Sequence, residues 1–230
     1  MTAIQTRKVQ TVEDREAAFN LRYRAYVLER GVPQKHADHR LQHIQEPQDP
    51  PEGEGSLDTG IIFGAFSGNQ LLGSLRINRV EAFGSDYQHL LGLDQFGLKK
   101  EHNACVITKL CIEPNRRGSR AFLKLFLAYF EYTLRAGVMI SFADCNAPLY
   151  PLFTRLGALQ ALPNTHHHEY GLVHPLYMIM NDIDHFKVMK SPALRFQDLM
   201  TANYETVTYF QDVIRSIKSN TELEPNFIAA

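Results

Sequence analysis

The sequence predicts an α/β protein in which a mixed sheet is flanked by helices, and three stretches support this prediction. Residues 105–112 form an apolar, β-branched run that is typical of a buried strand. Residues 122–133 carry apolar side chains at three- and four-residue spacing, which predicts one face of a helix. Residues 60–66 and 71–80 have the composition of two strands joined by a Ser-Gly-Asn-Gln turn.

The bulk composition is that of an ordinary globular chain. It has 230 residues, of which 44% are hydrophobic and 21% charged, and a formal net charge of −1. That charge gives no global attraction to nucleic acid or to an anionic membrane. No apolar run approaches the about 18 residues of a membrane span, and the first residues lack the apolar centre of a secretion signal. Three cysteines without CxxC spacing favour a reducing compartment, so we expect a cytoplasmic protein.

The N-terminal part of the sequence predicts a strand, a long helix and an irregular loop. We expect the strand over residues 6–12 and the helix over 13–30, where Gly31 ends it. Residues 45–57 are rich in Pro, Gly and Glu, which argues against a regular element and suits an exposed flap over a substrate site. The predicted buried stripe of the helix comprises Ala18, Leu21, Ala25 and Leu28.

Three histidines follow the predicted helix. His36, His39 and His43 have the i, i+3, i+7 spacing that would align them on one helix face. No carboxylate or cysteine completes a recognisable set of ligands, so we expect no metal site here. A solvated or acid-sensing histidine face is the other interpretation.

A short basic turn separates the predicted strand 105–112 from the helix after it. The turn has the sequence Arg-Arg-Gly-Ser-Arg at residues 116–120, and Lys124 follows one turn into the helix. This arrangement places backbone N–H groups, a helix N-terminus and several cations at one point, which suits an anion and most often a phosphate. A solvated basic helix start is the alternative.

This stretch resembles motif A of the GCN5-related N-acetyltransferase (GNAT) superfamily, in which Q/R-x-x-G-x-G/A follows a central strand. The central Arg117-Gly118 is present, whereas Asn115 and Arg120 depart from the pattern. The resemblance implies a GNAT-like fold: a central twisted, mostly antiparallel sheet with splayed strands, flanked by helices and followed by C-terminal helices. The large Arg120 favours an acyl carrier protein over free coenzyme A as the donor.

Other motifs resemble two groups of GNAT-fold enzymes, the acyl-homoserine-lactone synthases and the long-chain N-acyl amino acid synthases. Arg22 and Tyr26 match the Arg-x-x-x-aromatic element of these enzymes. A loop that ends in Asp58-Thr59 and a hairpin that carries Leu-Arg-Ile around Arg76 follow in the same order. Thr108-Lys109-Leu110 occupies the place of Ser-Arg-aromatic. The chain lacks the tryptophan of those enzymes, so its acceptor pocket is expected to differ.

Acyl transfer from a thioester to an amine needs a neutral amine near the carbonyl, a route for its proton, donors for the oxyanion and a grip on the phosphopantetheine arm. By resemblance, backbone N–H groups of residues 110–112 serve the arm and the oxyanion. Lys109 is the candidate for a cation that holds an acceptor carboxylate or has a structural role, or it simply ends a strand in water. The implied catalytic residues are Arg22, Tyr26, Asp58, Arg76, Thr108 and Lys109. The implied donor-binding residues are Leu110, Cys111, Ile112, Arg116, Arg117, Gly118, Ser119, Arg120, Ala121, Asn146 and Tyr150.

Asn146 and Tyr150 belong to a second resemblance, in which an Asn follows a strand and precedes a short helix closed by Gly157. Tyr150 could donate a proton to the leaving thiol, although a tyrosine in a short amphipathic helix is often a core residue. Residues 166–168, three consecutive histidines, are expected in a loop, with a histidine general base as the alternative.

The C-terminal part predicts a strand over residues 174–180, then a helix that starts at Ser191-Pro192. We expect one domain over residues 1–190 and a helical extension over 191–230 that packs on it. These helices either cover the core, line a slot for a long acyl chain, or form an interface. Their apolar positions are Phe196, Leu199, Met200, Tyr204, Val207, Phe210, Ile214 and Ile217.

The sequence therefore predicts an N-acyltransferase that moves an acyl group from acyl carrier protein or coenzyme A to the amine of an amino acid or similar small acceptor. A short-chain acetyl-CoA-dependent acetyltransferase and a non-catalytic carrier-binding domain are the alternatives. A long apolar pocket for the acyl chain would exclude the short-chain acetyltransferase. Binding without release of the thiol would favour the non-catalytic domain. No side chain is an unambiguous general base, and the amine proton could leave through ordered water.

Overall fold

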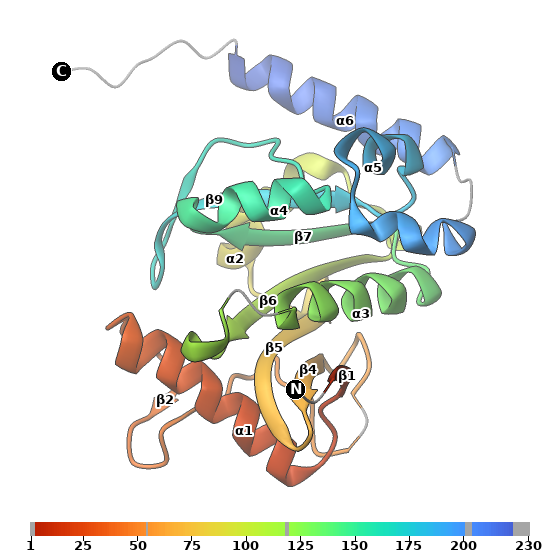
Figure 1. Cartoon of the computed structure of the whole chain (residues 1–230). Helices are drawn as coiled ribbons and strands as arrows, with labels where there is room; N and C mark the ends of the chain where they lie inside the picture. The colour runs from red at the N-terminus through yellow and green to blue at the C-terminus, as the bar shows by residue number, and fades with distance from the viewer. Residues whose placement is uncertain (1–2, 54, 118–119, 201–203, 223–230) are drawn as a thin grey trace, which may run out of the picture. The chain divides into compact units, whose positions relative to one another are not determined.

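The computed structural model describes residues 3–53, 55–117, 120–200 and 204–222 (Figure 1). The chain forms two compact units. The first, called the N-terminal unit, comprises Met1–Phe83 and Cys105–Thr133. The second, called the C-terminal unit, comprises Gly84–Ala104 and Leu134–Ala230. Each unit has its own sheet strands and helices, so each is described separately.

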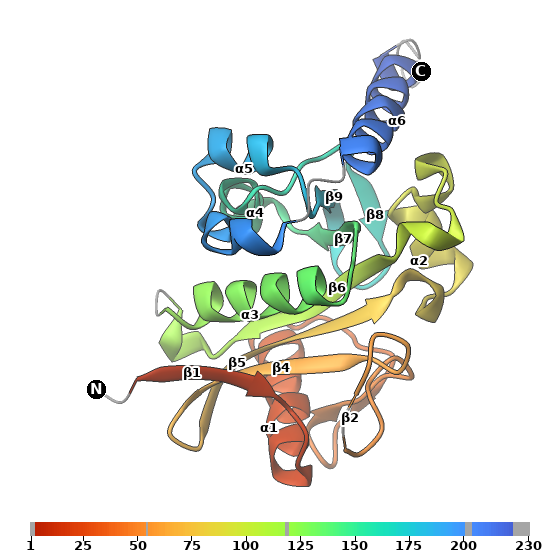
Figure 2. The ribbon, with the colours of Figure 1, turned by 90° about the vertical axis from the view of Figure 1, so that its right-hand side faces the viewer.

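The N-terminal unit contains four strands in the order β1-β4-β5-β6, and each neighbouring pair is antiparallel. The four strands expected in this part of the chain are present, but the first covers residues 4–8 rather than 6–12, because Thr11 caps a helix that begins at Val12. The strands are β1 (Ile4–Lys8), β4 (Ile61–Ser67), β5 (Gln70–Arg79) and β6 (Ala104–Ile112). Two helices, α1 (Val12–Tyr23) and α3 (Ala121–Arg135), lie on opposite faces of these strands (Figure 2).

The long helix expected over residues 13–30 changes type in its middle. After α1 the chain continues as a π-helix over Arg24–Glu29, and Gly31 follows with a φ of 63°. Ala18, Leu21 and Ala25 are buried as predicted, but Leu28 is 59% exposed. The prediction for Leu28 was wrong because the wider turn of a π-helix takes residues out of the 3.6-residue phase.

Strand β5 presents an apolar face and a polar face because its side chains alternate. Leu75 and Ile77 belong to the core. The opposite face carries three side chains that are polar and yet fully buried: Ser74, Arg76 and Asn78. The Asn78 amide donates a hydrogen bond to the Gln48 carbonyl over 2.8 Å, so the loop before β4 covers this face. A polar strand face inside the unit can hold charged side chains away from water.

The histidine-rich segment does not form a helix. It forms a small hairpin of β2 (Ala37–Asp38) and β3 (His43–Ile44). His39 Nδ1 lies 2.9 Å from the Tyr23 hydroxyl, and His43 Nε2 lies 2.9 Å from a Glu16 carboxylate oxygen. The expectation of one aligned histidine face was wrong, because Asp38 caps a turn by accepting the Arg40 and Leu41 amides.

The C-terminal unit contains three antiparallel strands in the order β7-β9-β8. They are β7 (Ile140–Cys145), β9 (Gly171–Ile179) and β8 (Thr165–His167). Helices α4 (Tyr150–Leu156) and α5 (Ile183–Met189) lie on one face, and residues 85–102 lie on the other (Figure 2). The latter segment includes α2 (Ser85–Leu90) and a 3₁₀ turn whose Phe96 ring lies 4.9 Å from the Phe142 ring.

Two of the three consecutive histidines, His166 and His167, are part of this sheet rather than a loop, because residues 165–167 form β8, and His168 lies in the turn that follows. His167 is buried, with its ring packed near Tyr87 and Tyr170. The expected helix start at Ser191 is confirmed, since its hydroxyl accepts the Ala193 amide over 3.2 Å. A 3₁₀ segment, Pro192–Leu199, and helix α6 (Tyr204–Glu222) follow.

Helix α6 packs within the C-terminal unit through one apolar side. Phe210, Ile214 and Ile217 are buried, and Tyr209 donates a hydrogen bond to the Gly97 carbonyl over 2.7 Å. The division into a domain over 1–190 and an extension over 191–230 stays a prediction. None of the helices in the described ranges combines the length and apolar character that a bilayer crossing requires.

Gly157, which ends α4, is expected to be required for stability. Its φ is 107°, and an added Cβ would lie 2.5 Å from the fully buried Phe186 ring. Gly68 has a φ of 60° but no atom within 4 Å of such a Cβ. We expect Gly68→Ala to lower the free energy of unfolding by about 1 kcal/mol, for backbone strain alone. Gly157→Ala should lower it by about 3 kcal/mol, since crowding adds to the strain.

Urea denaturation of the two glycine variants measures both losses. Equal losses would show that the Phe186 contact contributes nothing.

Candidate functional site

Five charged side chains meet on the polar face of β5 and form what we call the ionic cluster. Arg22 lies in the last turn of α1, Arg76 lies in β5 and Lys109 lies in β6. The loop after β3 supplies the two carboxylates, Glu46 and Asp49. These residues lie up to about ninety positions apart in the sequence. The sheet and the loop that covers it bring them together.

The contacts within the ionic cluster are short and paired. One Arg22 nitrogen lies 2.8 Å from both Asp49 carboxylate oxygens. Arg76 lies 3.1 Å from Asp49 and 2.8 Å from Glu46. Lys109 Nζ lies 2.6 Å from the other Glu46 oxygen. Arg76 Nε also donates to the Thr108 hydroxyl over 3.0 Å. Each carboxylate is thus shared by two cations, which makes the cluster one connected network.

Burial makes this network unusual. The side chains of Arg22 and Asp49 have no accessible surface, and Arg76 has 1%. Lys109 and Glu46 retain 6% and 11%, so the accessible end of the cluster is theirs. Three cations face two carboxylates, which leaves a formal charge of +1. Each cation is paired, but the cluster as a whole keeps this excess charge, which an anionic ligand would balance.

The electrostatic environment keeps both carboxylates ionised. Burial opposes the charge of Glu46, but Lys109 and Arg76 outweigh burial and lower its pKa from 4.5 to about 2. Burial likewise opposes the charge of Asp49, and Arg22 and Arg76 hold its pKa below the ordinary value. A carboxylate with so low a pKa is a weak proton acceptor at neutral pH. Glu46 is therefore poorly suited to act as a general base.

A β-bulge places Lys109 in the cluster. Cys111 pairs with Ser74 and Thr108 pairs with Arg76, so two residues of β6, Lys109 and Leu110, oppose one residue of β5. Lys109 has a φ of 52°, in the left-handed region that costs a non-glycine residue about 1 kcal/mol or more. The bulge turns the Lys109 ammonium toward Glu46 and interrupts the regular ladder at Leu110.

Some polar atoms of the cluster region have no hydrogen-bond partner among the described residues. These are Arg22 Nε, the second terminal nitrogen of Arg22, and the Ser74 hydroxyl, all of which are buried. Unpaired buried donors are rare in folded proteins and call for a water or a ligand. They show that the site has hydrogen-bonding capacity beyond its own ion pairs.

The structure brings together five of the six predicted catalytic residues. Arg22, Arg76, Thr108 and Lys109 are in direct contact through the cluster, and Lys109 Nζ lies 5.4 Å from the centre of the Tyr26 ring. Asp58 is separate, because its exposed carboxylate lies 2.5 Å from Arg79 Nε. Sequence reasoning missed Glu46 and Asp49. The three cations could have indicated them, because buried cations need carboxylates as counter-ions. Both carboxylates lie in a loop that we expected to be exposed.

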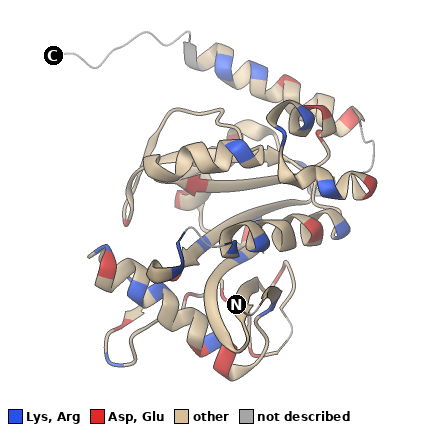
Figure 3. Cartoon of the chain, in the orientation of Figure 1, with Lys and Arg blue, Asp and Glu red and all other residues tan. Residues whose placement is uncertain are grey.

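The predicted donor-binding turn is solvent-accessible. Arg116, Arg117 and Arg120 are exposed, and Figure 3 shows Lys and Arg gathered at the turn before α3 and in its first turn. The Arg117 guanidinium pairs with both Glu29 oxygens, one of them at 2.6 Å. Ala121 is fully buried at the start of α3. Gly118 and Ser119 lie outside the described residues.

The other predicted donor-binding residues differ in their exposure. Leu110 and Ile112 are half-buried, whereas Cys111 is buried. Burial raises the pKa of the Cys111 thiol, although the Tyr26 hydroxyl lies within hydrogen-bonding reach of it. Cys111 is therefore a neutral thiol and a poor nucleophile.

Asn146 and Tyr150 belong to the C-terminal unit and have local partners there. The Asn146 amide donates to the carbonyls of Tyr170 and Leu172 over 2.9 and 3.3 Å. The Tyr150 ring stacks on the His174 ring at 4.5 Å. These contacts hold both side chains within the unit, and their role in donor binding stays a prediction.

His167, His168 and Glu169 offer ligand atoms within 4.8 Å of one another. Their geometry disfavours a metal ion, because the two imidazole rings are stacked within 17° of parallel. The in-plane lone pairs of parallel stacked rings do not converge on one point, as tetrahedral coordination requires. In addition, His167 Nδ1 already accepts the Glu169 amide over 3.0 Å.

Glu46→Gln is expected to lower stability in a pH-dependent way. Because the folded-state pKa is depressed, the contribution of Glu46 is fully present above pH 4.5 and is lost as the pH falls toward about 2. At about 1.4 kcal/mol for each pKa unit, this contribution is up to about 3 kcal/mol. Urea denaturation at pH 7, 5 and 3 should show the gap between wild type and variant shrinking below pH 4.5.

Asp58→Asn is the matched control for Glu46→Gln, because Asp58 also pairs with an arginine but its side chain is 72% exposed. We expect this variant to change stability by less than about 0.5 kcal/mol at each pH. A pH-independent gap for Glu46→Gln would contradict an ionised, charge-stabilised Glu46.

The fold of this chain was compared with those of known proteins. Three solved structures share the fold at low sequence identity. FeeM, an N-acyl amino acid synthase from uncultured soil microbes, matches with a TM-score of 0.62 and 15% identity over 79% of this chain and 93% of its own. BjaI, a CoA-dependent acyl-homoserine lactone synthase solved with SAM and isopentyl-CoA, matches with a TM-score of 0.61 and 16% identity over 84% and 91%. TofI, solved with an inhibitor and MTA, matches with a TM-score of 0.62 and 12% identity over 86% and 100%.

No match was found among the curated proteins. The sequence model of the family "N-acyl amino acid synthase FeeM", however, matches residues 17–180, which is more than half of the chain. The matched residues include every member of the ionic cluster. The fold is that of the acyl-CoA N-acyltransferases, as the sequence predicted. The chain therefore belongs to the FeeM family of N-acyl amino acid synthases, and it is an N-acyltransferase.

Proposed function

We propose that this enzyme transfers an acyl group from a phosphopantetheine thioester to the amine of an amino acid. The observation that carries the proposal is the net positive, buried ionic cluster whose accessible end is formed by Lys109 and Glu46. An amino acid differs from a simple amine by its carboxylate, and an excess positive charge in a low-dielectric site favours that carboxylate. The name of the matched family, an N-acyl amino acid synthase, supports the same acceptor class.

Lys109 is the residue that we assign to the acceptor carboxylate. Arg22 and Arg76 are too deeply buried for direct contact, whereas Lys109 keeps part of its side chain accessible. Its position in the bulge also sets it next to Leu110. We infer that the Leu110 N–H, beside the interrupted ladder, is a donor to the oxyanion of the tetrahedral intermediate.

In the proposed reaction the neutral amine attacks the thioester carbonyl, the tetrahedral oxyanion collapses and the thiolate leaves. The residues of the site position the acceptor and stabilise negative charge. Glu46 is too weak a base to take the amine proton at neutral pH, because its pKa is about 2. We infer that the proton leaves through water, with Glu46 and Asp49 fixing the cations in place.

The donor is proposed to bind at the basic turn before α3. Arg116 and Arg120 are exposed there, and Arg117 is tied to Glu29, so the first two are the residues that present their charge to a ligand. Acyl carrier protein and coenzyme A share the phosphopantetheine arm, and both are anionic. The bulky Arg120 supports the carrier protein, whereas the isopentyl-CoA in the BjaI structure supports a thioester donor in general.

Lys109→Met tests the assignment of the acceptor carboxylate. Methionine keeps the unbranched shape of lysine but removes its charge, which takes the formal charge of the cluster from +1 to zero. Wild type should acylate an amino acid at least about tenfold more efficiently than the corresponding decarboxylated amine, and Lys109→Met should lose that preference. The measurement is kcat/KM for both acceptors, with the product identified by mass spectrometry.

Lys187→Met, which changes an exposed lysine of α5, is the control for Lys109→Met and should keep the preference of wild type. If Lys109→Met still prefers the amino acid, the carboxylate is held elsewhere.

Arg116→Ala combined with Arg120→Ala tests the donor site. We expect kcat/KM for an acyl carrier protein thioester to fall at least about tenfold at low salt, with a smaller loss at high salt because charge attraction is screened. A matching loss with acyl-CoA would show that the shared phosphopantetheine phosphate is what the turn binds. Lys218→Ala removes an exposed cation of α6 and should have no effect. A double variant with wild-type kinetics for both donors would exclude the turn.

A further inference from the structure

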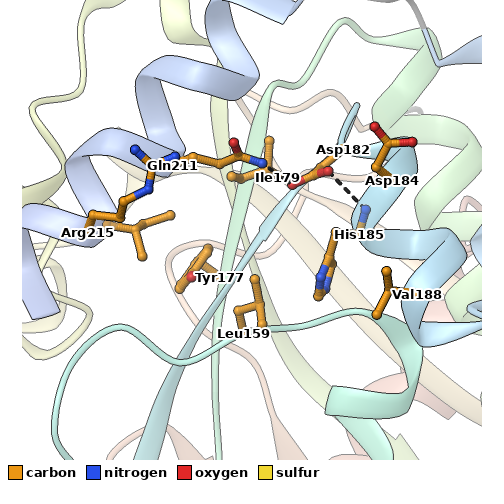
Figure 4. A pocket seen from close by; sticks show the side chains of 10 residues that line it. Leu159, Tyr177, Ile179, Asp182, Asp184, His185, Val188, Gln211 and Arg215 are labelled. Atoms are coloured by element: carbon orange, nitrogen blue, oxygen red, sulfur yellow. Dashed lines mark hydrogen bonds between the residues drawn. The ribbon is translucent and has the colours of Figure 1, made fainter.

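The C-terminal unit contains a hollow of about 390 Å³ at the end of β9, between α5 and α6 (Figure 4). Its volume lies in the range of small-molecule sites, which is about 300–1,000 Å³. Leu159, Ile179 and Ile214 give it an apolar lining, and Val188 lies at its exposed rim. The hollow lies in a different unit from the ionic cluster, and nothing in the proposed transfer uses it.

A buried carboxylate in this hollow lacks a cation. Asp182 is 7% exposed, and it accepts hydrogen bonds from the His185 amide at 3.1 Å and from the Gln211 side chain at 2.9 Å (Figure 4). Both donors are neutral groups. In the part of the chain that the structure describes, no lysine, arginine or histidine side chain forms an ion pair with Asp182. Buried carboxylates are ordinarily paired with a cation, so Asp182 leaves a negative charge to be matched.

A second polar group lines the same hollow. Tyr177 is 3% exposed, and it lines the hollow together with Asp182. Burial and the nearby Asp182 charge raise the pKa of the Tyr177 phenol, so it stays neutral and can both donate and accept. A neutral phenol at this place can accept a hydrogen bond from a ligand in the hollow.

The other charges of the lining do not neutralise Asp182. The Arg215 guanidinium lies 2.5 Å from Asp212, outside the hollow. Asp184 is an additional carboxylate at the rim, 3.4 Å from Lys187. The hollow therefore combines an apolar body with net negative charge at one side.

We propose that this hollow binds a small primary ammonium compound with an apolar body, its ammonium group placed between Asp182 and the Tyr177 hydroxyl. An ammonium has three donors for these oxygen acceptors, and the apolar lining removes the rest of the ligand from water. A neutral alcohol would leave the Asp182 charge unmatched, and a carboxylate would be repelled by it.

Isothermal titration of the full chain without any thioester tests this site. The probes are 2-phenylethylammonium, the neutral 2-phenylethanol and the anionic 3-phenylpropanoate. We expect the ammonium to bind at least tenfold more tightly than either of the other two. Comparable binding of 3-phenylpropanoate would overturn the proposal.

Two variants of the hollow assign the binding to it. Asp182→Asn should weaken ammonium binding at least tenfold, and the helix start is retained because Asn also caps helices well. Tyr177→Phe should weaken it about threefold. Lys109→Met, in the other unit, should leave it unchanged. Loss of binding in Lys109→Met, with Asp182→Asn unaffected, would place the amine at the acceptor site and overturn the proposal without touching the proposed function.

Two variants of an exposed residue at the rim test the charge selectivity of the hollow without changing a buried residue. Val188 is 79% exposed, so both Val188→Lys and Val188→Glu should fold. The lysine brings a competing ammonium to the rim and should weaken binding at least threefold, whereas the glutamate should not weaken it. Equal affinities of the two rim variants would contradict a charge-selective hollow.

Discussion

The pairing of Arg76 with two carboxylates is the interaction on which the N-terminal unit depends. Arg76 lies in the middle of β5 with 1% of its side chain accessible, and a lone guanidinium there would be strongly destabilising. Asp49 and Glu46 neutralise the guanidinium, and the loop that contains them covers the polar face of the strand. Arg22 and Lys109 then attach α1 and β6 to the same carboxylates. One charge network thus joins a helix, two strands and a loop.

Two departures from regular geometry accompany this network. The end of α1 gives way to a π-helix directly after the turn that carries Arg22, and β6 has its bulge at Lys109. Both features cost conformational energy, and both are typical of functional sites. The π-helix follows Arg22, which is still in the regular part of α1, whereas the bulge contains Lys109 itself. Lys109 is thus a residue of the ionic cluster whose own backbone is strained.

The sequence predicted the regular elements well because apolar periodicity is a local signal. The expected strands of the N-terminal unit, the helix after the basic turn and the start at Ser191 are all present. It also selected Arg22, Arg76 and Lys109 through resemblance. It did not find Glu46 and Asp49, because a Pro- and Gly-rich loop looks exposed when the strand beneath it is not known. It misplaced Leu28, because no local pattern signals a π-helix.

We propose that the ionic cluster serves ligand binding rather than stability. Buried ion pairs are often no more stabilising than well-packed apolar side chains of similar volume, so stability alone gives little reason for five charges here. An apolar replacement would satisfy the core but would lose the +1 excess and the unpaired Arg22 and Ser74 donors. Those unpaired groups have a cost in the free protein that only a ligand or water removes. A related argument, with the opposite sign of charge, applies in the C-terminal unit, where the Asp182 carboxylate is hydrogen-bonded but has no cation beside it among the residues that the structure describes. In the N-terminal unit the unsatisfied donors, and in the C-terminal unit the unbalanced charge, are the features from which we infer the chemistry of a ligand.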